Sequence, residues 1–439
     1  MGNQNTKQTT STIFQGMKYS ALDPLETNYE QAITVLTPFQ SLKNLPVPFS
    51  EPQCVLHKHE ILICGGYKKS DCYSYHTIKN KYKYICDYPQ SIFLNGHCVM
   101  KLVDNSSYEN NNEITLLSLG RYCEHTLVMK YISVWNDDNG DNNDNNDNND
   151  NDIKKFKKPN NYNQWVSLVS NDNHIIRITR HEDDYQGMRA VIGGSNSHLL
   201  FITYRQNNIS VYNLKTFKFI KRDILPIDDV IWYHCFVSKS ENGQEENNIE
   251  KKGRKNEMLL FCKKIGLSIK YDEDNNTFQF RQLSVCEDIE IFNYYAYVHI
   301  NNAILFFGGH CREGNKYVTS KAIHKYLIQE NSWITFEYTL PIPLYKCFGI
   351  LNEDNTCIHI IGGSDDKENT VPIHVKTNVN EWIASHLVRL LAAFQTIFFF
   401  NAYNKFIKMS STKKSTVKTR SQNHLSTLDS NFRDKIRMD

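Results

Sequence analysis

Histidine and cysteine, which often hold metals or act in catalysis, are numerous in this chain but form no recognisable motif. The chain has 16 histidines and 12 cysteines among 439 residues. No two cysteines have the C-x-x-C spacing, and no two histidines stand four residues apart as in helical zinc sites. No serine nucleophile elbow, phosphate-binding loop or dinucleotide fingerprint is present either. We therefore expect no catalytic residue, no cofactor and no metal.

Charge and cysteine usage predict a cytoplasmic protein with no nucleic-acid partner. The chain carries 50 Lys and Arg against 48 Asp and Glu, a formal net charge of +2, so no overall field attracts nucleic acid. Most cysteines stand beside apolar residues, as reduced thiols of cytosolic proteins do. Met1 to Ser11 is polar and no apolar segment follows it, so no signal peptide is expected.

Paired glycines mark a repeat. Three pairs close short apolar runs, which are typical of buried strands that end in a turn; these pairs are Gly65-Gly66, Gly308-Gly309 and Gly362-Gly363. A fourth pair, Gly193-Gly194, is expected in a hairpin turn one strand earlier. The second copy keeps only Gly120, and the third and fourth copies have Tyr204-Arg205 and Lys263-Lys264 at the aligned place.

Two aromatic residues seven positions apart follow these positions in most copies; in the second copy an insertion separates the two. The first and second aromatics of successive copies are Tyr75 and Tyr82, Tyr131 and Trp165, Tyr212 and Phe219, Tyr271 and Phe278, and Tyr326 and Trp333, with Val375 and Trp382 in the last copy. Asparagine stands two residues before the second aromatic in most copies, at Asn80, Asn163, Asn276, Asn331 and Asn380. Because asparagine tolerates left-handed backbone, it favours a hairpin turn there. Leu-Pro or Tyr-Pro links join several copies.

The order of double glycine, tyrosine, tryptophan and Leu-Pro resembles the kelch repeat. Its best copy runs from Ile304 to Pro341, and the next best from Ile61 to Pro89. The resemblance implies an all-β fold, a β-propeller of about six four-stranded kelch-like blades. It also implies that one blade is completed by strands from both ends of the chain. We favour Thr37 to Asn44 as the closing strand, with Glu381 to Ser385 as the alternative.

The predicted domain boundaries follow from these features. Residues 1–30 are expected to be disordered, 31–387 to form the propeller, 388–407 an apolar helix, and 408–439 a basic disordered tail. Two insertions, 136–160 and 238–256, are expected to be solvated loops. The first is rich in Asn and Asp and buries almost no apolar surface. A calcium site there is a weaker alternative, since the run lacks the glycine and terminal glutamate of a calcium loop.

Both termini suggest contact with a membrane. Met1-Gly2 begins an N-myristoylation pattern, so Gly2 is a candidate lipidation site. One acyl chain binds membranes only weakly, and the basic tail from Lys405 to Arg420 could supply a second signal. Arg389 and Gln395 interrupt the apolar segment before that tail, which favours a helix on the propeller or at an interface over a membrane span.

The main hypothesis for function is a non-enzymatic protein–protein interaction scaffold or adaptor, because the loops of a rigid ring are free to vary. The alternative is a membrane-peripheral regulatory protein recruited through Gly2. The resemblance also implies a remote alternative, a copper oxidase of the galactose-oxidase type, since such enzymes use this repeat with Tyr, His and Cys ligands.

Overall fold

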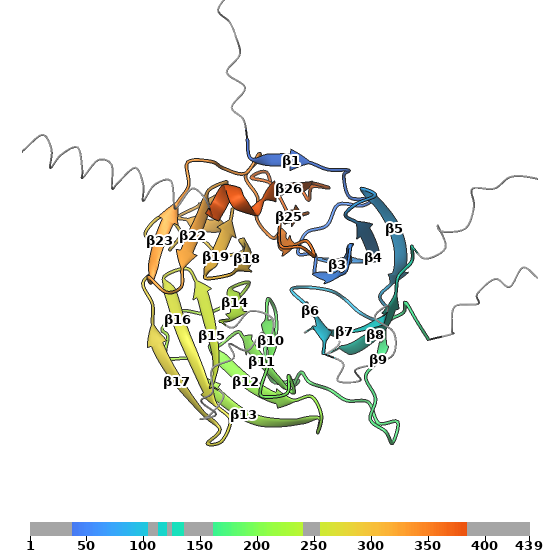
Figure 1. Cartoon of the computed structure of the whole chain (residues 1–439). Helices are drawn as coiled ribbons and strands as arrows, with labels where there is room; N and C mark the ends of the chain where they lie inside the picture. Colours follow the sequence, from blue (N-terminus) through green and yellow to red (C-terminus); the bar gives the residue numbers. More distant parts are fainter. Residues whose placement is uncertain (1–36, 104–112, 121–124, 136–160, 240–254, 384–439) are drawn as a thin grey trace, which may run out of the picture. The chain divides into compact units, whose positions relative to one another are not determined.

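The computed structural model describes residues 37–103, 113–120, 125–135, 161–239 and 255–383, all in one compact unit that begins at Thr37. These residues form six four-stranded antiparallel sheets and one two-stranded sheet. The six larger sheets are arranged as blades around a common centre (Figure 1). The structure therefore confirms the all-β propeller of about six blades.

The first three blades each consist of four strands that are consecutive in sequence. Blade one contains β2 (Cys54–His57), β3 (Glu60–Gly66), β4 (Lys69–His76) and β5 (Lys81–Asp87). Blade two contains β6 (Cys98–Leu102), β7 (Glu113–Leu119), β8 (Thr126–Ile132) and β9 (Val166–Ser167). Blade three contains β10 (Arg189–Gly193), β11 (Leu199–Tyr204), β12 (Asn208–Asn213) and β13 (Lys218–Ile224).

The last three blades include one insertion and the closure of the ring. Blade four contains β14 (Cys235–Ser238), β15 (Lys255–Cys262), β16 (Ile265–Asp272) and β17 (Thr277–Gln282). Blade five contains β18 (Ala296–Ile300), β19 (Ala303–Phe307), β22 (Ile323–Leu327) and β23 (Ser332–Thr335), and β20 (His310–Glu313) with β21 (Lys316–Thr319) forms a hairpin between them. Blade six contains β24 (Phe348–Leu351), β25 (Cys357–Ile361), β26 (His374–Asn378) and β1 (Phe39–Ser41).

The N-terminal strand closes the ring. β1 pairs with β26, and Phe39 lies opposite Thr377. This pairing confirms the N-terminal closing strand. Residues 379–383 form a short helix instead of a competing strand. Within that helix Trp382 is fully buried, and its ring lies 5.7 Å from that of Phe39.

One apolar cluster fills each boundary between neighbouring blades, so the hydrophobic core forms six separate wedges. β3 contributes side chains to two of these wedges. Leu62 and Cys64 pack toward blade two, whereas Ile61 and Ile63 pack toward blade six. Successive side chains of a strand point to opposite faces. The central strands are therefore apolar throughout, because both of their faces are buried.

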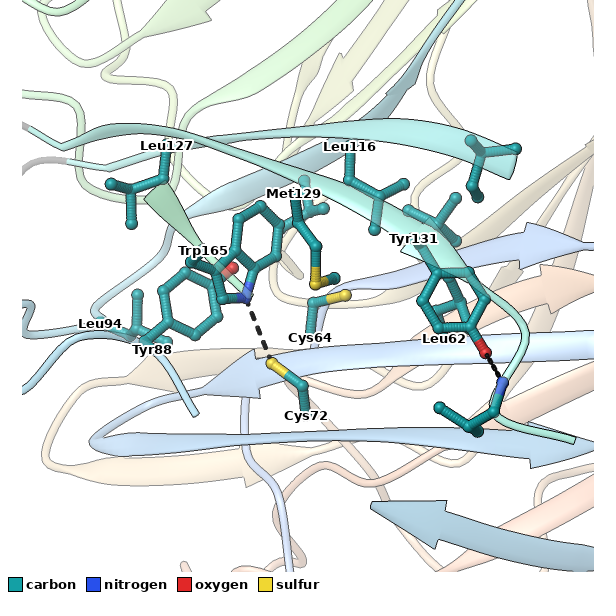
Figure 2. Packing of buried hydrophobic residues seen from close by; sticks show 14 of the residues in the cluster. Leu62, Cys64, Cys72, Tyr88, Leu94, Leu116, Leu127, Met129, Tyr131 and Trp165 are labelled. Carbon is teal, nitrogen blue, oxygen red and sulfur yellow. Dashed lines mark hydrogen bonds between the residues drawn. The ribbon is translucent and has the colours of Figure 1, made fainter. Parts of the chain in front are cut away.

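Figure 2 shows the wedge between blades one and two. Trp165 stacks on Tyr88 with ring centroids 4.7 Å apart and donates its indole N–H to Cys72 Sγ at 3.4 Å. The register pairs Val128 with Val166, so Trp165 does not lie opposite Tyr131. The two aromatics of the second copy therefore do not form a cross-strand pair. Both are buried in the core of this wedge.

The other aromatic pairs lie directly opposite each other on neighbouring strands. Their ring centroids are 4.9 Å apart for Tyr75 and Tyr82, 5.1 Å for Tyr212 and Phe219, 4.9 Å for Tyr271 and Phe278, and 5.1 Å for Tyr326 and Trp333. Asparagine supports three of these pairs. Each tyrosine hydroxyl donates to its amide oxygen, from Tyr75 to Asn80 (3.0 Å), Tyr271 to Asn276 (2.7 Å) and Tyr326 to Asn331 (2.8 Å). These asparagines have left-handed backbone, as predicted, whereas Asn380 lies in the short helix.

Blade three lacks this asparagine, and Phe217 takes its place with a φ of 55°. The Tyr212 hydroxyl is consequently buried without a hydrogen-bond partner among the described residues. Phe217→Asn is expected to raise the free energy of unfolding by about 1–2 kcal/mol, since it relieves strain and supplies the acceptor. Urea denaturation measures the gain. In a Tyr212→Phe background the same substitution should gain less; an equal gain in both backgrounds would contradict the hydrogen-bond explanation.

Both ends of the insertion predicted at 238–256 lie in strands, because β14 ends at Ser238 and β15 begins at Lys255. The hairpin β20–β21 was not predicted at all. The expected segments 1–30, 136–160, 388–407 and 408–439 lie outside the described residues.

Candidate functional site

The same backbone conformation recurs just before the innermost strand of every blade. In each link one residue, two or three positions before that strand, has left-handed backbone. These residues and their φ angles are Glu51 (60°), Gly96 (64°), Gly187 (69°), Tyr233 (48°), Tyr294 (58°) and Lys346 (56°). Left-handed backbone strains a residue with a side chain, and such strain concentrates at functional sites. The four that are not glycine are therefore candidate functional residues.

Main-chain hydrogen bonds join several of these six residues from blade to blade. The bonds run from Glu51 N to Lys346 O (2.8 Å), Lys346 N to Tyr294 O (2.8 Å), Tyr233 N to Gly187 O (2.9 Å) and Gly187 N to Gly96 O (3.1 Å). Between blades two and one a side chain completes the connection, since Gly96 N donates to Glu51 Oε2 at 2.8 Å. We call this end of the central channel, lined by these six residues and Arg189, the channel mouth.

An ion pair lies within the channel mouth. Lys346 Nζ lies 2.8 Å from Glu51 Oε1, and the Glu51 side chain is almost fully buried. Four tyrosine rings surround the Lys346 ammonium at 5.3–5.9 Å from their centroids: Tyr67, Tyr233, Tyr294 and Tyr345. An ammonium is attracted to aromatic faces at such distances. Lys346 and Glu51 therefore neutralise each other and hold the rings in fixed positions.

Arg189, the first residue of β10, has no such partner. Its Nη1 donates to the carbonyl of Met188 at 2.8 Å, and its guanidinium lies 5.9 Å from the Tyr233 ring. Among the described residues, no carboxylate lies within 4.0 Å of its nitrogens, whereas Arg205 pairs with Asp184 at 2.9 Å. Arg189 therefore gives the mouth an uncompensated positive charge.

The positive charge of Arg189 also acts on the histidines behind the mouth. Burial, with the nearby charge of Arg189, lowers the pKa of His97 to about 4. Burial and the same charge lower the pKa of His234 well below its usual value. Both imidazoles are consequently neutral at pH 7.

The inserted hairpin of blade five adds aromatic surface beside the mouth. His310 stacks on Tyr345 with ring centroids 4.3 Å apart and on Tyr317 at 5.2 Å. Tyr317 is 58% exposed, so its outer face is available to a partner. Arg312, Glu313 and Lys316 of the same hairpin are exposed as well. The hairpin therefore offers an exposed aromatic ring together with charges of both signs.

The channel mouth encloses a small cavity of about 20 Å³, room for roughly one water molecule. Its lining includes Glu51, Arg189, Tyr233, Tyr294 and Lys346. This volume is far below that of a ligand pocket, so a bound group would contact the rim of the mouth. The arrangement can bind an anionic group through Arg189 and an apolar or planar group against the tyrosine rings.

The residues predicted from the repeat motif lie elsewhere and have structural roles. Gly65, Gly308 and Gly362 have left-handed backbone and lie against the link to the next blade. Gly120 follows β7, and its α-carbon faces the ring of His125. Gly66, Gly309 and Gly363 complete the same turns, and the aromatic pairs fill the wedges. None of the seven motif glycines lines the cavity of the channel mouth.

The sequence prediction missed the channel mouth. Apart from Arg189, its residues share one signal, their position two or three residues before the first strand of each copy, but their types differ from blade to blade. Gly2, the candidate lipidation site, and the basic tail lie outside the described residues. In the part of the chain that the structure describes, no helix is long and apolar enough to cross a membrane.

Comparison with known proteins adds little to this geometry. No protein-family model matches the chain. No curated protein matches it either. Among solved structures, the chain is similar to one titled "Structure of YjhT", with 12% sequence identity and a TM-score of 0.49 over 75% of this chain and 95% of that chain. So distant a likeness carries no argument about function, and the assignment of the fold rests on the six sheets themselves.

Proposed function

We propose that this chain is a non-enzymatic protein-binding propeller of the kelch type, which holds an acidic segment of a partner protein at its channel mouth. The observation that carries the proposal is Arg189, whose guanidinium has no carboxylate partner among the described residues. A carboxylate of a bound protein would supply that partner. Arginine suits this role because its planar fork binds a carboxylate through two hydrogen bonds.

The surroundings of Arg189 support recognition of a protein. Tyrosine, tryptophan and arginine are the residue types that most often dominate binding energy at protein interfaces. Tyr233 and Tyr294 stack with ring centroids 4.3 Å apart, and Arg205 lies 4.6 Å from the Trp232 ring. Rigid aromatic rings lose little entropy when a partner binds.

The size and rigidity of the site also favour binding over turnover. A cavity of about 20 Å³ holds roughly one water molecule, so the mouth offers its rim to a partner and encloses no substrate-sized space. The main-chain hydrogen bonds between blades hold the mouth in place before a partner arrives, which lowers the entropic cost of binding. Kelch-type identity is supported by the turns at Gly65, Gly308 and Gly362 and by the cross-strand aromatic pairs.

Arg189→Ala is expected to weaken capture of the partner at least about tenfold, because truncating one member of a buried charge pair costs several kcal/mol. The tagged full chain and its variants would be used for affinity purification with quantitative mass spectrometry. The matched control is Arg281→Ala, which removes an exposed arginine from the outer strand β17. Far-ultraviolet circular dichroism checks that both variants keep the β-rich fold.

The proposal predicts at least one protein that wild type and Arg281→Ala recover equally and that Arg189→Ala loses. Acidic peptides from that protein should then compete for the site, and raising the salt concentration should weaken binding. Equal recovery of every partner by all three proteins would show that the channel mouth is not the binding surface.

A further inference from the structure

A cluster of three different metal-ligand types lies away from the channel mouth. Cys286 and Asp288 belong to the link between blades four and five, and His324 belongs to β22. The Cys286 sulfur, a carboxylate oxygen of Asp288 and a ring nitrogen of His324 all lie within 4.8 Å of one another. His324 stands far from the other two in the sequence, so no spacing motif marks them.

Hydrogen bonds hold the link beside the outer hairpin of blade five. Trp333 Nε1 donates to the carbonyl of Ser284 at 2.8 Å. The Thr335 hydroxyl donates to Asp288 Oδ2 at 2.8 Å and lies 3.1 Å from His324 Nδ1. Since His324 and Thr335 are opposite each other in the register of β22 and β23, this hydroxyl connects two of the three candidate ligands.

The histidine of this cluster is buried and incompletely satisfied. His324 is only 1% exposed, and its Nε2 has no hydrogen-bond partner among the described residues. Leaving a buried polar atom unpaired costs about 1–3 kcal/mol, and most buried polar atoms in native proteins have a partner. This observation is independent of the clustering and also points to a ligand.

We infer that Cys286, Asp288 and His324 bind one divalent metal ion of the zinc class. Thiolate and imidazole together favour zinc over magnesium or calcium, which prefer oxygen ligands. In a tetrahedral zinc site the ligand atoms are about 3.3–3.8 Å apart, so these three need to approach by at most about 1.5 Å. Asp288 is exposed and Cys286 lies in a link, so both can make this adjustment. A water molecule would fill the fourth position.

Such an ion would fasten the link between blades four and five to the outer strands of blade five. A bound metal that joins two segments of the native state stabilises it by mass action. The inference does not depend on the proposed function, because the cluster and the channel mouth share no residue.

Titration of the metal-free full chain with Co²⁺, under a non-thiol reductant, tests the site. The expected result is one Co²⁺ per chain with a thiolate-to-cobalt charge-transfer absorption that Zn²⁺ removes. Cys286→Ser should abolish this absorption, and Asp288→Asn should weaken binding at least about tenfold. Cys357→Ser, which removes a partly buried cysteine outside the cluster, is the control and should bind as wild type does.

A second measurement guards against variants that fail to fold. A Zn²⁺ concentration that saturates wild type should raise the melting temperature of wild type and of Cys357→Ser more than that of Asp288→Asn, whose exposed side chain can be changed without disturbing the core. The inference is overturned if wild type shows no charge-transfer absorption, or if Cys286→Ser and Asp288→Asn bind Co²⁺ as tightly as wild type.

Discussion

Lowering the pH from 7.5 to 5 is expected to reduce the free energy of unfolding of this propeller by roughly 5–8 kcal/mol. The cause is a set of histidines that the fold buries in the neutral form. Burial lowers the pKa of His97 and that of His359 to about 4. Burial, together with nearby positive charge, lowers the pKa of His234 and that of His374 well below the usual value.

The folded and unfolded states differ in how readily these histidines bind protons, which determines the direction of the change in stability. Each folded pKa is below the unfolded value of about 6.5, so the unfolded chain binds protons more readily. The stabilisation is complete above pH 6.5, falls as the pH drops below that value, and is exhausted near pH 4 for His97 and His359. At pH 5 each histidine accounts for about 2 kcal/mol. Domains are stable by only about 5–15 kcal/mol, so marked acid lability should follow.

Urea denaturation followed by tryptophan fluorescence, at pH 7.5 and at pH 5, measures this difference. His97→Gln removes one titrating group, and a glutamine amide can still donate to the carbonyl of Cys64, which His97 Nε2 contacts at 2.9 Å. The pH difference should shrink by about 2 kcal/mol in this variant. In the control His174→Gln, which changes an exposed histidine, it should not shrink. Equal stability of wild type at the two pH values would refute the prediction.

Gly308→Ala is expected to lower the free energy of unfolding by about 3–5 kcal/mol. Gly308 has a φ of 68°, and a Cβ atom there would lie 2.1 Å from the carbonyl oxygen of Leu344 in the link to blade six. That oxygen accepts a hydrogen bond from Gly309 N at 2.9 Å, so it cannot move without breaking this bond. The substitution therefore adds a steric clash to the strain of left-handed backbone.

Gly314→Ala provides a matched control for that substitution. Gly314 also has left-handed backbone, with a φ of 60°, but a Cβ atom there would meet no atom within 4 Å. It should cost only about 1 kcal/mol, the strain of the backbone alone. Thermal and urea unfolding of both variants separate the two effects. Similar losses at the two positions would mean that the close approach of the link to Gly308 does not matter.

Much of the propeller could be predicted from the sequence because its determinants are local and repeated. The turn at Gly308, the asparagine turns at Asn80 and Asn276, and the aromatic pair Tyr326 and Trp333 each depend on residues close together in the chain. Strand periodicity and turn chemistry act over such short distances. Repetition of the same pattern then identifies the ring. The pattern differs where an insertion changes the spacing, as between Tyr131 and Trp165, which do not lie opposite each other.

The channel mouth could not be predicted because it is formed by single residues from links that are far apart in the sequence. Glu51 and Lys346 are far apart in the chain, yet they form an ion pair because the ring brings the first and last blades together. The same holds for Cys286 and His324, which belong to different elements and share no sequence pattern. Their types vary freely from blade to blade, since the fold constrains the backbone at these positions more than the side chain.

The double glycines and aromatic pairs thus determined by themselves that the chain forms a ring of about six blades. The tertiary structure alone decided which strand closes the ring, which residues meet at the channel mouth, and that Arg189 has no carboxylate partner among the described residues. The physical reason is how far apart in the sequence the interacting residues lie. Turns and strands are fixed by neighbours in sequence, whereas charge pairing and burial depend on which blades lie side by side.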